Sequence, residues 1–335
     1  MSTTTDQMAP LLQVDGLTVH FETPLGVVRA VEEVSFHVEV GECCAMVGES
    51  ACGKTVTALA LSRLIHCPPG RYVSGRILFR GRDILSLPSR ELRRLRGNRI
   101  SYIFQEPAVA LNPVFRIGYQ IGEAIRLHRG KRDVYPEVEH LLEMVGMPDP
   151  RRALQSYPHQ LSGGMQQRAM IAMALACNPD LLVADEPTTA LDVTIQAQIL
   201  DLLRSLQSRV GMAVLFITHN LALVRGLARR IYVMYAGQLV EEGPTSELLD
   251  QPLHPYTRSL IAAVPRLRRR GVVLEAIPGA VPDALNPPPG CRFQPRCRWA
   301  DERCARETPD MVPVLPNRRV RCFRWKEILT EDRGT

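Results

Sequence analysis

The residues best suited to chemistry lie at positions 48–55, which read Gly-Glu-Ser-Ala-Cys-Gly-Lys-Thr. They match the pattern G-x-x-x-x-G-K-[ST], follow an apolar run at 43–47 that predicts a strand, and precede a predicted helix at 56–63. In that setting the loop amides and the helix N-terminus offer unpaired donors to phosphate oxygens. We expect Lys54 to reach the β- and γ-phosphates of a nucleotide and the Thr55 hydroxyl to bind Mg²⁺.

Two carboxylates, Asp185 and Glu186, follow a second apolar run at 181–184. An aspartate at the carboxyl end of a parallel strand, beside a phosphate loop, can hold Mg²⁺ directly or through water. Glu186, one residue further along, is placed to polarise an attacking water. Paired carboxylates after a strand are common, so this prediction depends on the phosphate loop.

The elements that must position these residues alternate between strands and helices. Polar and apolar residues alternate at 34–40 and 17–21, which predicts half-buried strands. Short strands are also predicted at 99–105, 181–184 and 212–217, with a helix at 195–210. A helical insertion is expected at about 91–168. This order predicts an α/β fold built on a parallel sheet.

Composition narrows the class of protein. The 335 residues are 45% hydrophobic and 23% charged, as in ordinary globular chains, and the length suits about two domains. No run of about 18 apolar residues or secretory signal is present, so we expect a cytosolic protein. Residues 251–335 carry 16 basic and 9 acidic side chains. This basic tail would suit nucleic acid, membrane headgroups or a simple solvated face.

Residues 157–168, Tyr-Pro-His-Gln-Leu-Ser-Gly-Gly-Met-Gln-Gln-Arg, resemble the LSGGQ signature of ABC-type ATPases. They open a predicted helix at 166–176. The remaining family motifs follow in order: Gln105 fits the Q-loop, residues 189–192 (Thr-Ala-Leu-Asp) fit the D-loop, and His219 fits the H-loop. Phe21 stands where the family stacks an aromatic ring on adenine, although a core strand residue is the other interpretation. Outside this series, His219 would be interpreted as a core histidine.

The resemblance implies ATP and Mg²⁺ as ligands. It assigns ATP contacts to Gly48, Glu49, Ser50, Ala51, Cys52, Gly53, Lys54 and Thr55. It assigns Mg²⁺ to Thr55, Gln105 and Asp185, and catalysis to Glu186, His219 and Gln105. In this family two subunits close head to tail on two ATPs, so the signature residues would act in trans: Ser162, Gly163, Gly164 and Gln166.

Two positions depart from the family pattern. Ala51 stands where glycine is usual, and its Cβ would disfavour a positive φ. Asn220 follows the switch histidine where aspartate is common. Because Lys54, Asp185 and Glu186 are intact, we expect an active ATPase; a non-catalytic regulatory subunit is the alternative.

Three shorter segments resemble the dipeptide, oligopeptide and nickel importer branch of this family: 104–107 (Phe-Gln-Glu-Pro), 254–257 (His-Pro-Tyr-Thr) and 290–297. They imply an ABC-type P-loop ATPase core at 1–255, with a mixed sheet, an antiparallel β part and a helical subdomain at about 91–168. A small irregular C-terminal metal-cluster extension would occupy 256–335. The implied function is ATP hydrolysis that energises import of di- or oligopeptides. Alternatives are nickel or glutathione import, or a soluble ABC protein acting on nucleic acid.

The same resemblance implies the partners. These are a second homologous ATPase subunit in a heterodimer, two permease subunits and an extracytoplasmic substrate-binding protein, with no nucleic acid. The chain would then be peripheral, at the cytoplasmic face of the inner membrane.

The tail also holds Cys291, Cys297, Cys304 and Cys322, separated by five, six and seventeen residues. Disulfides are disfavoured in a reducing compartment, and the paired C-x₂-C hooks typical of structural zinc are absent. Four thiolates can ligate a [4Fe–4S] cluster, and the resemblance to the peptide-importer branch implies one at these cysteines. Neighbouring arginines would offset its negative charge. Zinc and unligated packing cysteines remain the alternatives, and the other five cysteines are expected to be packing residues.

Overall fold

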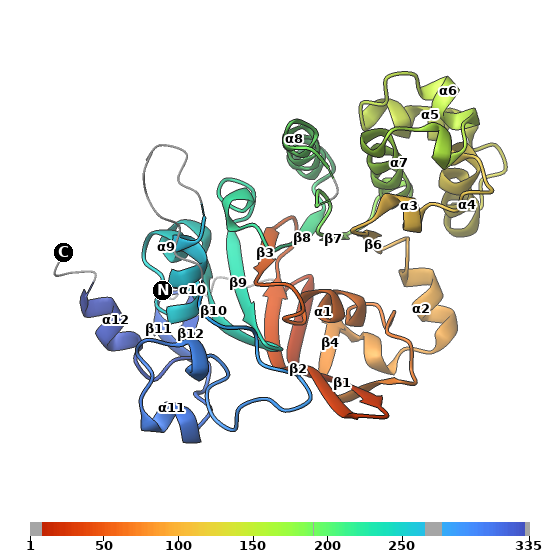
Figure 1. The fold of residues 1–335 in the computed structure, drawn as a ribbon. Helices are drawn as coiled ribbons and strands as arrows, with labels where there is room; N and C mark the ends of the chain where they lie inside the picture. Colours follow the sequence, from red (N-terminus) through yellow and green to blue (C-terminus); the bar gives the residue numbers. More distant parts are fainter. Residues whose placement is uncertain (1–8, 190, 265–276, 332–335) are drawn as a thin grey trace, which may run out of the picture. The chain divides into compact units, whose positions relative to one another are not determined.

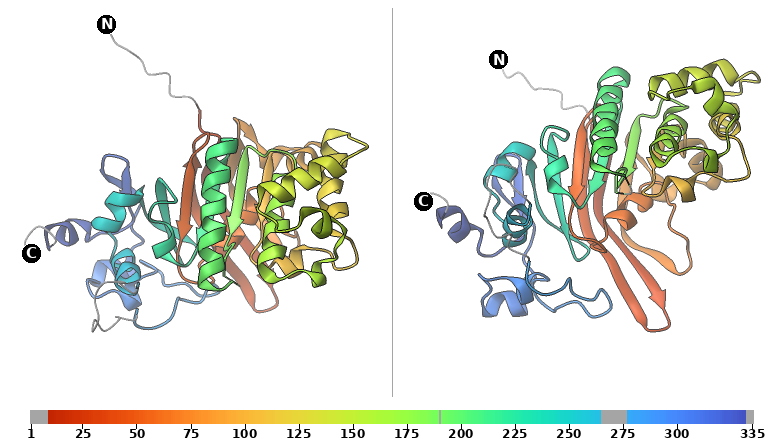
Figure 2. Two further views of the ribbon diagram at one scale, coloured as in Figure 1. Left: turned by 90° about the horizontal axis from the view of Figure 1, so that it is seen from above. Right: turned by 45° about the horizontal axis from the view of Figure 1, so that its top comes forward.

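The computed structural model describes residues 9–189, 191–264 and 277–331. The chain divides into two compact units. The loop unit comprises residues 1–38, 44–85 and 218–335, and the helical unit comprises 39–43 and 86–217. Figures 1 and 2 show the elements of each unit.

The loop unit contains an antiparallel sheet in the order β2-β1-β4-β5 and a second set of strands in the order β11-β12-β10-β9-β3. β3 and β9 are parallel, whereas β9, β10, β12 and β11 pair antiparallel, so the predicted mixed sheet with an antiparallel part is confirmed. Its strands are β1 (Leu12–Thr23), β2 (Gly26–Val38), β3 (Cys43–Val47), β4 (Gly70–Phe79), β5 (Arg82–Asp83), β9 (Arg230–Tyr235), β10 (Gln238–Pro244), β11 (Val312–Leu315) and β12 (Arg318–Val320).

The C-terminal extension is more regular than the predicted irregular wrap. β11 and β12 extend the sheet of the ATPase core, and Glu241 of β10 pairs with Val320 of β12. In Figure 1 these two strands lie beside β10. Pro313 lies within β11, and because proline favours loops and sheet edges this short strand is hard to recognise in the sequence.

Short helices connect the strands of the loop unit: α1 (Lys54–Ala60), η1 (Ile84–Ser86), η3 (Leu221–Leu223), α9 (Thr245–Asp250), α10 (Pro255–Ala262), η4 (Gln294–Arg296), α11 (Glu302–Arg306) and α12 (Trp325–Glu331). The helix after the phosphate loop therefore begins and ends earlier than the predicted 56–63. Its first residue is the motif lysine, so the loop passes directly into the helix.

The helical unit places three parallel strands in the order β8-β7-β6. They are β6 (Ile100–Ile103), β7 (Leu181–Asp185) and β8 (Ala213–Thr218). Every residue of β7 is buried, as expected for a parallel strand covered on both faces. β6 is shorter than the predicted 99–105, because Pro107 begins a new helix.

The helices of this unit are α2 (Ser89–Leu95), α3 (Pro107–Ala110), α4 (Ile117–Arg129), α5 (Tyr135–Met144), α6 (Pro150–Gln155), η2 (Pro158–Gln160), α7 (Gly163–Leu175) and α8 (Val193–Val210). The first seven fall in the region where the helical insertion is predicted, and α8 corresponds to the helix predicted at 195–210. Ile121, Ile125, Val138 and Leu142 are fully buried, as the helical spacing predicts. α7 begins three residues before the predicted start at 166, because Ser162 caps it by accepting a hydrogen bond from the Met165 amide.

Candidate functional site

The phosphate loop runs between β3 and α1 with two glycines at positions that exclude a side chain. A Cβ on Gly48 would lie 2.2 Å from the Met234 carbonyl oxygen. A Cβ on Gly53, whose φ is +105°, would lie 2.5 Å from the Ala30 carbonyl oxygen. Both motif glycines are therefore required by close backbone approach, and Gly53 also by its positive φ.

Lys54 is folded back onto its own loop. Its side chain is buried, and Nζ donates to the carbonyl oxygens of Gly48 at 2.9 Å and Glu49 at 2.8 Å. Nζ also lies 3.7 Å from Cys52 Sγ. Burial raises the pKa of the Cys52 thiol, and the charge of Lys54 opposes that shift. The Thr55 residue, at the start of α1, is exposed.

Ala51 adopts the left-handed conformation that its position predicts, with φ of +61°. The alanine is exposed, so its Cβ meets no packing conflict. A non-glycine residue in this region costs about 1–2 kcal/mol. The loop therefore keeps its shape in spite of the departure from glycine.

The carboxylates of the helical unit lie at the end of β7. Asp185 is buried, and Glu186, with φ of +45°, is partly exposed. The Thr189 hydroxyl donates to Glu186 Oε2 at 2.8 Å, and the Gln105 side-chain amide lies 3.5 Å from the same oxygen. The structure thus brings together the predicted water-polarising carboxylate and the Q-loop glutamine. Ala190 of the D-loop lies outside the described residues.

The signature segment presents an exposed helix start within the helical unit. Ser162 and Gly163 are exposed, and α7 begins directly after the serine. The Gln166 side chain donates to the carbonyl oxygens of Pro158 at 2.9 Å and Leu161 at 3.2 Å, so it braces the preceding turn. Gly164 fits against Ile195, whose Cγ2 would lie 3.1 Å from an added Cβ. The exposed N-terminus of this 13-residue helix has backbone amides that can donate hydrogen bonds to phosphate oxygens.

The two remaining predicted residues lie in the loop unit. His219 is exposed, which excludes the alternative of a buried core histidine. Phe21 is partly exposed on β1, where it pairs with Val28 of β2 and Gly70 of β4. Phe21 is therefore not fully buried in the core.

Two residues that contact the phosphate loop were not among the site residues predicted from the sequence. Tyr256 Oη accepts a hydrogen bond from the Glu49 amide at 2.8 Å. Arg296 of the C-terminal extension donates to the Glu49 carboxylate at 2.7 Å. The segment His-Pro-Tyr-Thr at 254–257 is visible in the sequence, but its contact with Glu49 depends on tertiary structure.

The four tail cysteines do not surround a single ion. Within residues 9–189, 191–264 and 277–331, no three His, Cys, Asp or Glu side chains are grouped so that they could hold a metal ion. The predicted metal-cluster extension is therefore not shown. Cys291 and Cys304 are nevertheless adjacent, since the Cys291 amide donates to the Cys304 carbonyl oxygen at 2.8 Å.

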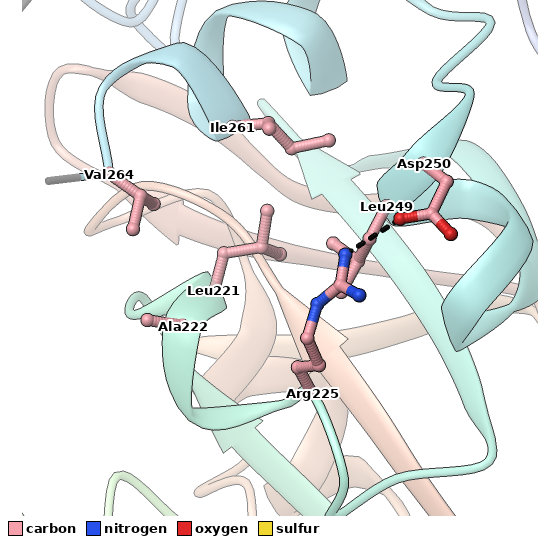
Figure 3. A pocket seen from close by; sticks show the side chains of 7 residues that line it. All are labelled: Leu221, Ala222, Arg225, Leu249, Asp250, Ile261 and Val264. Carbon is pink, nitrogen blue, oxygen red and sulfur yellow. Dashed lines mark hydrogen bonds and ion pairs between the residues drawn. The ribbon is translucent and has the colours of Figure 1, made fainter. Parts of the chain in front are cut away.

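A separate pocket of about 520 Å³ lies between η3, α9 and α10 (Figure 3). Apolar side chains including Leu221 and Ile261 line it, and an ion pair of 2.8 Å joins Arg225 to Asp250 at its edge. None of the predicted site residues lines this pocket, so it carries no part of the phosphate chemistry. No helix among the described residues is long and apolar enough to cross a membrane.

Comparison with known proteins agrees with this geometry. The family model described as "ABC transporter" matches residues 31–189, and that described as "Oligopeptide/dipeptide transporter, C-terminal region" matches 240–304. A Brucella ovis protein named for peptide import and ATP binding is 50% identical over 95% of this chain and 98% of its own length. The dipeptide transport ATP-binding protein DppD of Escherichia coli is 47% identical over 93% of this chain and 96% of its own.

The fold also matches a solved structure. The ATP-binding cassette MJ0796, a dimer in a post-hydrolysis state with ADP and phosphate, gives a TM-score of 0.63 at 26% identity. That match covers 70% of this chain and 98% of the cassette. The chain accordingly belongs to the ABC transporter family of ATP-hydrolysing subunits, in the branch that carries the oligopeptide and dipeptide transporter C-terminal region.

Proposed function

We propose that this chain hydrolyses ATP to energise the import of peptides, di- or oligopeptides, through a membrane permease. The observation that carries the proposal is the combination, in one chain, of an intact phosphate loop and a matched peptide-transporter C-terminal region at 240–304. The full-length similarity to relatives named for peptide and dipeptide transport supports peptides over nickel or glutathione. No comparable observation favours a soluble protein acting on nucleic acid.

In the proposed cycle Lys54 leaves its loop carbonyls and binds the β- and γ-phosphates of ATP. The Thr55 hydroxyl, Gln105 and Asp185 would hold Mg²⁺, which would neutralise charge on the phosphates. Phe21 stacks on the adenine. Phosphoryl transfer depends mainly on positioning and electrostatic stabilisation, which suits a loop of fixed shape.

Glu186 polarises the attacking water, and His219 contacts the γ-phosphate. The 2.8 Å bond from Thr189 and the nearby Gln105 amide support this role, because they hold the Glu186 carboxylate in one orientation. The signature residues of a second subunit, Ser162, Gly163, Gly164 and Gln166, act in trans, with Ser162 and Gly164 on the γ-phosphate. The exposed start of α7 supports that role.

Replacing the water-polarising carboxylate tests the assignment. Glu186→Gln is expected to retain ATP binding and to lower turnover on the order of 10²-fold or more. Thr189→Val, which removes one hydrogen bond to Glu186, is expected to have a smaller effect on turnover. Hydrolysis by Glu186→Gln at the parent rate would show that another group activates the water.

The partners are a second homologous ATPase subunit, two permease subunits and an extracytoplasmic binding protein, with the chain at the cytoplasmic face of the membrane. An apolar surface of the helical unit supports a permease contact: Val109, Val114, Phe115 and Tyr119 are 78, 68, 44 and 41% exposed. The Phe115 and Tyr119 rings stack with centroids 4.9 Å apart. Exposed apolar clusters of this kind mark interaction sites.

Reconstitution with the permeases and the binding protein tests this assembly. We expect ATP hydrolysis to depend on peptide, and Val114→Asp to abolish peptide stimulation while leaving ATP binding intact. Leu127→Asp is the matched control, because Leu127 is 74% exposed on the same unit. Equal loss from both variants would point to general damage to this unit and against a specific permease surface.

The proposed division of the chain remains an ATPase domain at 1–255, with its helical subdomain at about 91–168, and an extension at 256–335. In the extension, Cys291, Cys297, Cys304 and Cys322 are proposed to hold a [4Fe–4S] cluster. Burial, with a smaller contribution from the thiols of Cys291, Cys297 and Cys304, raises the pKa of the Cys322 thiol to about 12, which supports a common location.

Zinc, whose thiolate ligands lie about 2.3 Å from the metal, is the alternative occupant of these cysteines. A cubane cluster is larger than one ion and accepts wider ligand spacing. Anaerobic purification with iron and sulfide analysis tests the proposal. A colourless protein that contains one zinc ion and no acid-labile sulfide would refute it.

A further inference from the structure

The C-terminal extension reaches the phosphate loop through a buried arginine. The Arg296 side chain is 4% exposed, and its Nη1 and Nη2 donate to Glu49 Oε2 at 2.7 Å and Oε1 at 3.1 Å. This is a bidentate pair between residues 247 positions apart. Paired guanidinium–carboxylate bonds fix orientation as well as distance.

The guanidinium is itself held in place. Arg296 Nε donates to the Pro278 carbonyl oxygen at 2.7 Å, and Nη1 lies 3.3 Å from the Tyr235 hydroxyl. Its remaining Nη2 contact is the Ile277 carbonyl oxygen at 3.4 Å. The arginine therefore offers Glu49 a preorganised fork, which a lysine could not reproduce.

The main chain of Glu49 is fixed at the same point. Its amide donates to Tyr256 Oη at 2.8 Å, and its carbonyl oxygen accepts from Lys54 Nζ at 2.8 Å. The residue after the first motif glycine is thus tied to the extension, to α10 and to the phosphate-binding lysine. Any movement of Glu49 changes the resting place of Lys54.

A second arginine of the extension supports the phosphate loop near Cys52. Arg292 pairs with Glu32 and donates to the Ala236 carbonyl oxygen. The next residue, Gly237, donates its amide to the Cys52 carbonyl oxygen at 2.8 Å. Arg292 therefore acts on the loop through one turn, whereas Arg296 acts on it directly.

We infer that Arg296 is a positioning residue for ATP binding, and that the extension forms part of the nucleotide site by holding Glu49. The inference rests on the proposed role of residues 48–55 in binding ATP phosphates. Without the arginine the loop samples more conformations, and ATP must order it on binding. Charge-assisted hydrogen bonds are typically worth enough to change an equilibrium tenfold or more.

Titration of the full-length chain with a fluorescent ATP analogue and Mg²⁺ tests this inference. Arg296→Met is expected to raise the Kd for the analogue about tenfold or more, and Arg296→Lys to raise it by less. Glu49→Gln should raise Kd similarly, and the double variant Glu49→Gln with Arg296→Met should add little to either change. Arg306→Met is the matched control, because its pair with Glu302 lies on the exposed surface of the extension.

Non-additivity separates positioning from general stability. Trp299 and Trp325 are the two tryptophans of the chain, and both lie in the extension, so their fluorescence reports whether it stays folded. If Arg296→Met disturbs that signal, Glu49→Gln carries the test, because it leaves every side chain of the extension in place. If the fold increase in Kd of the double variant equals the product of the fold increases of Glu49→Gln and Arg296→Met, the two residues act independently and the inference is refuted.

Lys54→Ala separates failure of this inference from failure of the proposed function. Unchanged Kd in Arg296→Met and Glu49→Gln, with binding lost in Lys54→Ala, would overturn the positioning role alone. Undiminished binding in Lys54→Ala would overturn the phosphate-loop assignment, and the inference with it.

Discussion

The ion pair between Arg318 and Glu241 joins the extension to the ATPase core in a fully buried setting. Arg318 Nη2 donates to Glu241 Oε1 at 2.8 Å, and the two side chains are 1% and 0% exposed. Glu241 also accepts from the amides of Leu253 at 2.8 Å and His254 at 2.9 Å. The carboxylate therefore fixes the chain just before α10, from which Tyr256 reaches the phosphate loop.

We predict that Arg318→Met destabilises this unit by about 3–5 kcal/mol at neutral pH. Methionine keeps the length and the apolar stem but leaves a buried carboxylate without its cation, which is the costly outcome for a buried pair. The Gln251 carbonyl oxygen also loses a donor at 2.6 Å. The double variant Glu241→Gln with Arg318→Met should be less destabilised than Arg318→Met alone, because no charge is then left unpaired.

The pH dependence gives the prediction a sign. Burial raises the pKa of Glu241 above its ordinary value of 4.5, and Arg318 opposes that shift. A carboxyl with a raised folded-state pKa contributes its full stability below pH 4.5, and this stability is lost as pH rises through the folded pKa. Without Arg318 the folded pKa rises further, so the gap in unfolding free energy between wild type and variant should widen as pH rises above the wild-type folded pKa, by at most about 1.4 kcal/mol per pH unit.

Urea denaturation followed by tryptophan fluorescence measures the effect, because both tryptophans report on the extension. The comparison is made at pH 4.5, 6 and 7.5 with Arg306→Met as the surface control. A loss below about 1 kcal/mol at pH 7.5, or a difference that does not change with pH, would refute the reasoning.

Three further outcomes are expected. Ala51→Gly should stabilise the protein by about 0.5–1 kcal/mol in urea denaturation without weakening ATP binding, since φ is +61° there; a loss of stability would show that the alanine is unstrained. Gly53→Ala should abolish binding of the ATP analogue, because its Cβ would lie 2.5 Å from a carbonyl oxygen. Burial lowers the pKa of His254 to about 3, so stability is full above pH 6.5 and falls as pH drops toward 3. His254→Asn, which does not titrate, should gain about 2 kcal/mol relative to wild type between pH 7.5 and pH 5; an unchanged difference in unfolding free energy would contradict this.

The phosphate loop, the β7 carboxylates and the helical insertion could be predicted from sequence because each is a local pattern. Five apolar residues before a glycine define β3, and the spacing of Ile121 and Ile125 defines one face of α4. The start of α7 was misplaced, because its two glycines are poor helix formers and the cap at Ser162 outweighs them.

The contacts of the extension could not be predicted in the same way. Arg296 and Glu49 are far apart in sequence, and nothing near either residue specifies the other. Charge alone suggested that the basic tail faces solvent or a ligand, whereas Arg292, Arg296 and Arg318 are buried against carboxylates and carbonyl oxygens of the core. Only the tertiary fold decides which arginines are exposed.

The two strands that the extension adds to the sheet affect how the ATPase domain is expected to behave when the extension is removed. β12 covers the main-chain groups of β10, and the outermost strand is then β11, which is four residues long and contains Pro313. A short strand with proline is a poor template for further pairing. A chain cut after residue 255 would present the longer β10 as an open edge instead, and such a fragment is expected to self-associate through that edge. The extension therefore covers the edge of β10 as well as contacting the phosphate loop.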